Sequence, residues 1–166
     1  FTSANTGIAV GENGLILRTV NGGTSWTTLP ALTTQTLLSI TFAGAGTGYI
    51  AGGSGTILKT TDNGANWIPL TSSGTDYDLH SIFFTDPNHG YAVGFRFGYI
   101  GTVVLKTLNG GSSWFPFMNE TLNYLQAVCF TDANTGYAVG HGGALLKTTD
   151  GGFTWNPYSN GATRHL

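Results

Sequence analysis

Short runs in which apolar and polar residues alternate recur along this chain. In residues 37–42 the side chains of Ile40 and Phe42 fall on one face of an extended strand, because residues two apart point the same way. The same pattern recurs in residues 79–84 and 125–130. No segment keeps the 3.6-residue period of an amphipathic helix, so the chain is predicted to be all-β with essentially no helix.

Each of these strands opens a repeated unit. A turn rich in Asp, Asn and Gly leads to a second strand of the form Gly-Tyr-Ala-Val-Gly, whose small residues suggest backbone packed closely against a neighbouring sheet. A third strand ends in Lys-Thr and runs into the pattern Thr-x-Asp/Asn-x-Gly-x-x-Trp, which we call the tryptophan box. The boxes cover residues 19–26, 60–67, 107–114 and 148–155. A fourth strand is expected to begin at each Trp.

The boxes recur with a nearly fixed period, since their tryptophans lie 41, 47 and 41 residues apart. A four-stranded antiparallel sheet about every 40 residues is typical of a β-propeller blade. The sequence therefore predicts one all-β propeller region over residues 1–166, with four repeats of about 41 residues. Their approximate bounds are 1–35, 36–77, 78–123 and 124–166.

The two ends of the sequence bear on whether the blades form a closed ring. Phe1 aligns with Phe130, the last residue of a first strand, and Leu166 aligns with Leu125, where such a strand opens. Joined together, the ends would still lack about four residues of that strand. We therefore expect four consecutive blades of a larger propeller; the alternative is a closed four-blade ring with one shortened strand.

Composition narrows the possible partners and locations. Only 8% of residues are charged, the net charge is −2 and no basic run is present, so a nucleic-acid partner is not expected. No apolar stretch approaches the roughly 18 residues of a membrane span, and the single cysteine, Cys129, excludes an internal disulfide. A weakly charged surface rich in Thr, Ser, Asn and Gly favours an extracytoplasmic protein: periplasmic, on the cell surface or secreted. Without an initiator Met or a signal peptide, the chain is expected to be a processed product or part of a longer one.

The box resembles the Asp-box, also called the bacterial neuraminidase repeat. The fuller pattern, Ser-Ile-x-Phe, Gly-Tyr-Ala-Val-Gly and Leu-Lys-Thr-x-Asp-Gly-Gly-x-x-Trp, resembles the photosystem II stability/assembly factor family of propellers. That resemblance implies a protein–protein contact. Members of the family contact a photosynthetic reaction-centre subunit during its assembly. An Arg-rich patch helps to bind the partner there, whereas this chain has only Arg96 and Arg164 outside its repeat.

The box residues are predicted to be structural. A short Asp or Asn side chain can accept hydrogen bonds from the hairpin's own backbone, and the Trp can fill the gap between blades. Two boxes carry Asn in place of Asp, which argues against a required carboxylate or a metal site. The structural set is Asn21, Trp26, Asp62, Trp67, Asn109, Trp114, Asp150 and Trp155.

One stretch, residues 95–101, lengthens the loop between the second and third strands of the third unit. Aromatic residues and arginine dominate binding hot spots, so this loop is the candidate binding site. Propeller geometry would place it on the same face as the links between blades. The alternative is a longer hairpin that folds its own rings onto the blade. The candidate binding residues are Phe95, Arg96, Phe97, Tyr99, Asp76, Tyr77, Tyr124 and His141.

These features favour a non-enzymatic protein-binding or scaffold module of a secreted or surface bacterial protein, with another protein or a glycan as partner. One alternative is a glycoside hydrolase of sialidase or xyloglucanase type, but the chain lacks an arginine cluster and offers few carboxylates outside the repeat. Another is a structural subunit of an extracellular assembly, in which further blades or a neighbouring copy complete the array. No catalytic residue, cofactor or metal is expected, because the four histidines are scattered.

Overall fold

The computed structural model describes residues 1–44, 46–70, 76–96, 101–119 and 124–158, and within them every regular sheet is antiparallel. Each sheet uses strands that are consecutive in sequence. The first sheet contains β1 (Gly7–Val10), β2 (Ile16–Thr19) and β3 (Thr27–Thr28), and the second contains β4 (Leu37–Gly44), β5 (Thr47–Gly52), β6 (Ile57–Thr60) and β7 (Ile68–Leu70). The third contains β8 (Asp78–Phe84), β9 (Gly90–Phe95), β10 (Thr102–Thr107) and β11 (Phe115–Asn119), and the fourth contains β12 (Leu125–Phe130), β13 (Gly136–Gly140), β14 (Leu145–Thr148) and β15 (Asn156–Pro157).

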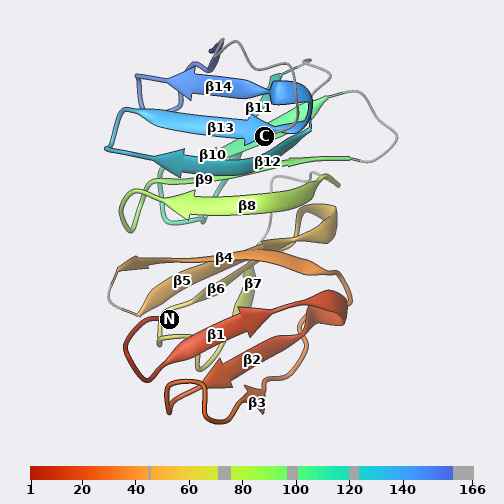
Figure 1. Ribbon diagram of the computed structural model, residues 1–166, viewed down its shortest axis with the longest axis vertical. Coiled ribbons are helices and arrows are strands. Elements are labelled where there is room, and N and C mark those ends of the chain that lie inside the picture. Colours follow the sequence, from red (N-terminus) through yellow and green to blue (C-terminus); the bar gives the residue numbers. More distant parts are fainter. Residues whose placement is uncertain (45, 71–75, 97–100, 120–123, 159–166) are drawn as a thin grey trace.

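These sheets are the blades of a propeller, numbered 1 to 4 in chain order. Figure 1 shows them following one another along the long axis, with blade 1 at one end and blade 4 at the other. No described strand pairs with the outer edge of β1, so blade 1 has three strands where the others have four. The predicted all-β propeller is confirmed, and its open arrangement agrees with a run of blades from a larger propeller.

The expectation of essentially no helix holds except for three one-turn connectors. They are the 3₁₀ turns η1 (Glu12–Gly14) between β1 and β2, η2 (Gly53–Gly55) between β5 and β6, and η3 (His141–Gly143) between β13 and β14. Three residues are too few to produce a helical period in the sequence, which explains why the pattern did not reveal them.

The hydrophobic core lies between the blades and not within any one of them. Trp67 closes a cluster with Ile16 and Ile50 of blades 1 and 2, and Trp114 closes one with Tyr49 of blade 2 and Leu105 of blade 3. At both positions the tryptophan is buried between two neighbouring sheets. Burial of this apolar surface between sheets is what makes each blade depend on its neighbour.

The small residues of the second strand have two roles, of which only one was predicted. Ala92 packs in the core between blades 2 and 3, as expected. Gly90, in contrast, makes room within its own blade, because a Cβ there would lie 2.4 Å from the ring of Phe84. At Gly94 a Cβ would lie 2.0 Å from the carbonyl oxygen of Asp78 on the adjacent strand.

Candidate functional site

The box hairpins owe their shape to local hydrogen bonds. In the box of blade 2, Asp62 Oδ1 accepts hydrogen bonds from the Asn66 backbone N–H at 2.9 Å and from Thr60 Oγ1 at 2.8 Å. These bonds, the backbone bond from Asn66 first, lower the pKa of Asp62 to about 2. Asn109 Oδ1 accepts the equivalent backbone bond in blade 3 without a charge. In both boxes the side-chain oxygen thus accepts a hydrogen bond from the backbone of its own hairpin.

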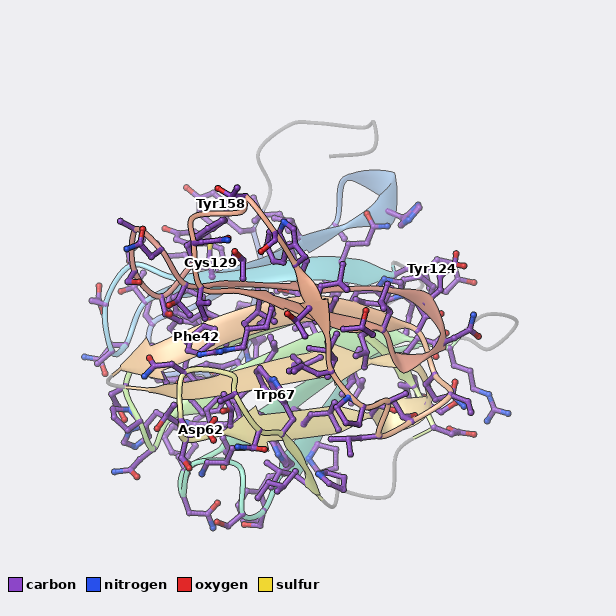
Figure 2. All side chains as sticks on the ribbon, turned by 90° about the horizontal axis from the view of Figure 1, so that it is seen from below. Phe42, Asp62, Trp67, Tyr124, Cys129 and Tyr158 are labelled. Atoms are coloured by element: carbon purple, nitrogen blue, oxygen red, sulfur yellow. The ribbon has the colours of Figure 1, made fainter. Side chains whose placement is uncertain are left out.

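The opposite ends of the strands carry an aromatic cluster. The ring of Phe95, at the end of β9, stacks on His80 of β8 at a centroid distance of 4.3 Å and on Tyr124 at 4.4 Å. His141, at the start of η3, meets the edges of Phe95 and Tyr124 at 6.3 and 5.9 Å. We call these four residues the ring stack; they join blade 3 to blade 4. Figure 2 shows Tyr124 on one side of the molecule and Asp62 on the opposite side.

The members of the ring stack differ in exposure. Phe95 is only 7% exposed, so its ring supports the stack from within, whereas His80, Tyr124 and His141 are half-buried. Burial lowers the pKa of His80 and His141 adds to this effect, while the charge of Asp78 opposes it. The lowered pKa favours the neutral imidazole of His80. A partner could therefore cover this ring and form hydrogen bonds with its nitrogens without the cost of desolvating a charge.

Charged residues sit beside the ring stack. Arg96 Nη1 pairs with Asp76 Oδ2, and their side chains are 40% and 59% exposed. Asp78 Oδ1 accepts a hydrogen bond from the Ser54 backbone N–H at 2.9 Å, which ties blade 3 to η2 of blade 2. The ring stack together with Arg96 and Asp76 forms what we call the loop-face site.

The structure brings together part of the predicted binding set. Phe95, Tyr124 and His141 are in contact and Arg96 pairs with Asp76, whereas Tyr77 packs against the core between blades 2 and 3. Phe97 and Tyr99 lie outside the described residues. Their role, like the binding role of the whole set, stays a prediction.

Sequence reasoning missed His80. The residue occupies a first-strand position that holds Leu38 in blade 2 and Gln126 in blade 4, so it is a departure from the repeat. This departure was the available signal. His80 lies on a strand and outside the lengthened loop, so its position in the sequence did not associate it with the candidate binding residues.

In the described part of the chain, no group of three His, Cys, Asp or Glu side chains could hold a metal ion. None of the helices described is long and apolar enough to cross a membrane.

Comparison with known proteins places the chain in a family. A sequence model of the family described as photosynthesis system II assembly factor YCF48 matches residues 1–74 and 69–159. No curated protein matches the chain significantly.

Several solved structures share the fold. A structure of YCF48 bound to D1 peptide matches with a TM-score of 0.62 and 16% identity, over 95% of this chain and 78% of that one. YCF48 from Cyanidioschyzon merolae matches with a TM-score of 0.66 and 22% identity, over 97% of this chain and 57% of that one. An ancestral GH74 enzyme matches with a TM-score of 0.76 and 17% identity, over 97% of this chain but 25% of that one.

At these identities the structural likeness shows the propeller fold and no more. The chain spans little more than half of the Cyanidioschyzon merolae protein and a quarter of the GH74 enzyme. The family model, in contrast, covers nearly the whole chain. The chain therefore belongs to the photosynthesis system II assembly factor YCF48 family.

Proposed function

We propose that this chain is a non-enzymatic protein-binding module of the assembly-factor type, and that its partner docks on the loop-face site. The observation that carries the proposal is the ring stack with the Arg96–Asp76 pair beside it. Family membership supports a protein as the partner, and so does the related structure of YCF48 bound to D1 peptide.

The chemistry of the loop-face site suits an extended peptide. Half-buried rings such as Tyr124 and His141 can bury further area against a partner with little additional loss of side-chain freedom. Arg96 is exposed enough to share its guanidinium between Asp76 and a carboxylate of the partner. Neutral His80 adds a hydrogen-bonding group at the edge of the stack.

The carboxylates of this face support a non-enzymatic role. Asp76 is paired with Arg96, and Asp78 is held by the Ser54 backbone N–H. Glycoside hydrolysis needs two carboxyl groups free to act on opposite sides of a sugar bond. An extracytoplasmic location in a bacterium belongs to the same proposal, supported by the low fraction of charged residues.

The proposal is tested by measuring the affinity for a D1 peptide by isothermal titration calorimetry. We expect Arg96→Ala and Tyr124→Ala each to weaken binding about tenfold, a typical effect of removing a hot-spot side chain. Tyr158→Ala is the matched control, because Tyr158 is an exposed aromatic residue just after β15, where Figure 2 shows it away from Tyr124.

Thermal unfolding of each variant separates a binding effect from a folding effect. Equal affinities for the wild type, Arg96→Ala and Tyr124→Ala would contradict the proposal. So would a loss of affinity in Tyr158→Ala as large as in the two site variants.

A further inference from the structure

A groove lies between blades 3 and 4 on the face that carries the tryptophan boxes, at the other end of β9 from Phe95. Its volume is about 330 Å³, which falls within the range of roughly 300–1,000 Å³ typical of small-molecule sites. Blade 3 contributes the turn between β8 and β9 and Lys106 of β10, and blade 4 contributes its box, including Asp150 and Phe153.

Lys106 is the unusual residue of this groove. Its side chain is only 3% exposed, and its Nζ lies 3.2 Å from the centre of the Phe153 ring. No described residue accepts a hydrogen bond from this ammonium group. Burial lowers the pKa of Lys106, an effect that the charge of Asp150 partly offsets. Because Lys106 lines the groove, its ammonium group can donate a hydrogen bond to a ligand that supplies an acceptor there.

The neighbouring blade junction provides an internal comparison. Lys59, at the same repeat position in blade 2, donates a hydrogen bond to the Gly110 carbonyl oxygen of the next box at 2.8 Å. At the junction of blades 3 and 4 the equivalent carbonyl, Gly151 O, accepts from Tyr91 Oη at 2.7 Å and receives no bond from Lys106.

One departure from the repeat lies directly at the Lys106 ammonium group. Phe153 stands where the other boxes carry Thr24, Ala65 and Ser112. Its ring lies against the ammonium group of Lys106, which faces the groove.

The acceptors in the groove are already engaged. Asp86 Oδ1 accepts from the Asn88 and His89 backbone N–H groups, and its Oδ2 pairs with His89 Nδ1 at 2.7 Å. Asp150 Oδ1 accepts from the Phe153 and Thr154 backbone N–H groups, and its Oδ2 from Thr154 Oγ1. Local donors thus hold both carboxylates in place, and neither carboxylate accepts a hydrogen bond from Lys106 among the described contacts.

We propose that this groove binds a carboxylate attached to an apolar group, with the carboxylate accepting a hydrogen bond from Lys106 Nζ. The apolar part would lie on the exposed surfaces of Phe153 and Leu108, which line the same groove. Both a small organic acid and the C-terminal carboxylate of a peptide have this chemistry. The inference is independent of the loop-face site, which lies on the other face.

The test is an NMR titration of the isotope-labelled chain with 3-phenylpropanoate, with its amide, and with acetyl-Ala-Phe in acid and amide forms. Binding of the two acids is expected to shift resonances of Lys106, His89 and Phe153, whereas the amides bind at least about tenfold more weakly. If only the dipeptide acid binds, the natural ligand is a peptide terminus; if only the small acid binds, it is a free organic acid.

Matched variants show which lysine binds the carboxylate. Lys106→Met should weaken acid binding about tenfold or more, whereas Lys59→Met should leave it unchanged, because the Lys59 ammonium already has its acceptor. If Lys106→Met fails to fold, two other measurements test whether Lys106 binds the acid. Lys106→Arg keeps a cation and should retain binding, and the wild type should bind the acid more tightly than the amide. The proposal is overturned if acid and amide bind alike, if no resonance in the groove shifts, or if Lys59→Met has the larger effect.

Discussion

Removing the hydroxyl group of Tyr91 is expected to weaken the junction of blades 3 and 4. Tyr91 is buried, and its Oη donates a hydrogen bond to Gly151 O at 2.7 Å. Burial, with smaller contributions from the charges of Asp86 and Asp150, raises the pKa of Tyr91 to about 12. The phenol is therefore a neutral donor at any pH at which the protein would be studied.

The size of the effect follows from what the substitution leaves behind. In Tyr91→Phe the buried Gly151 carbonyl loses the Tyr91 donor, which costs about 1–3 kcal/mol. In Tyr49→Phe the equivalent carbonyl, Gly110 O, keeps the hydrogen bond from Lys59 Nζ, so the cost should be about 0.5–1 kcal/mol. The two variants delete the same atom at the same repeat position, and the difference between them should be about 1 kcal/mol.

Urea unfolding followed by tryptophan fluorescence measures this difference, with the midpoint compared at equal slope. In thermal unfolding the same 1 kcal/mol corresponds to a difference of roughly 2–4 °C. If Tyr49→Phe destabilises the protein as much as Tyr91→Phe, Lys59 does not compensate at its junction. The contrast drawn between Lys59 and Lys106 would then be wrong.

Two further predictions concern the box and the second strand. The pKa of Asp62 is about 2 in the folded chain against an ordinary value of 3.8, so its hydrogen bonds stabilise the fold above about pH 4 and are lost as the pH falls toward 2. Asp62→Asn, which copies the boxes of blades 1 and 3, should therefore reduce the fall of the urea midpoint as the pH is lowered from about 4 to 2. If the midpoint of this variant falls as steeply as that of the wild type, groups other than Asp62 cause the loss of stability. Gly90→Ala places a Cβ 2.4 Å from the Phe84 ring and should lower the unfolding temperature sharply, whereas Gly11→Ala, with its nearest atom at 3.7 Å, should not; equal unfolding temperatures would contradict this packing argument.

The sequence predicted the blades because their determinants repeat at fixed positions. The alignment of Phe1 with the ends of the first strands is an example. Its ring meets Trp26 edge-on at 6.3 Å, much as Phe84 meets Trp114 at 6.0 Å. A contact that recurs in successive blades is visible as a period, so it can be recognised without coordinates.

The candidate site could not be predicted in the same way, because it depends on non-repeated residues that only the fold brings together. The ring stack combines residues from β8, the end of β9, the start of blade 4 and η3. Phe95 appeared in sequence as a candidate contact residue, yet the structure uses its ring to support its neighbours. Phe153 occupies a variable position of a box, where the other three boxes carry small residues. The box pattern does not specify this position, so it did not indicate that Phe153 is unusual.

Docking of a protein partner on the loop-face site can be tested by mapping the chemical-shift changes that a D1 peptide causes in the isotope-labelled chain. We expect changes concentrated at Arg96, Tyr124 and His141, with Asp62 and its box unaffected. Changes concentrated on the box face, or none at saturating peptide, would contradict it.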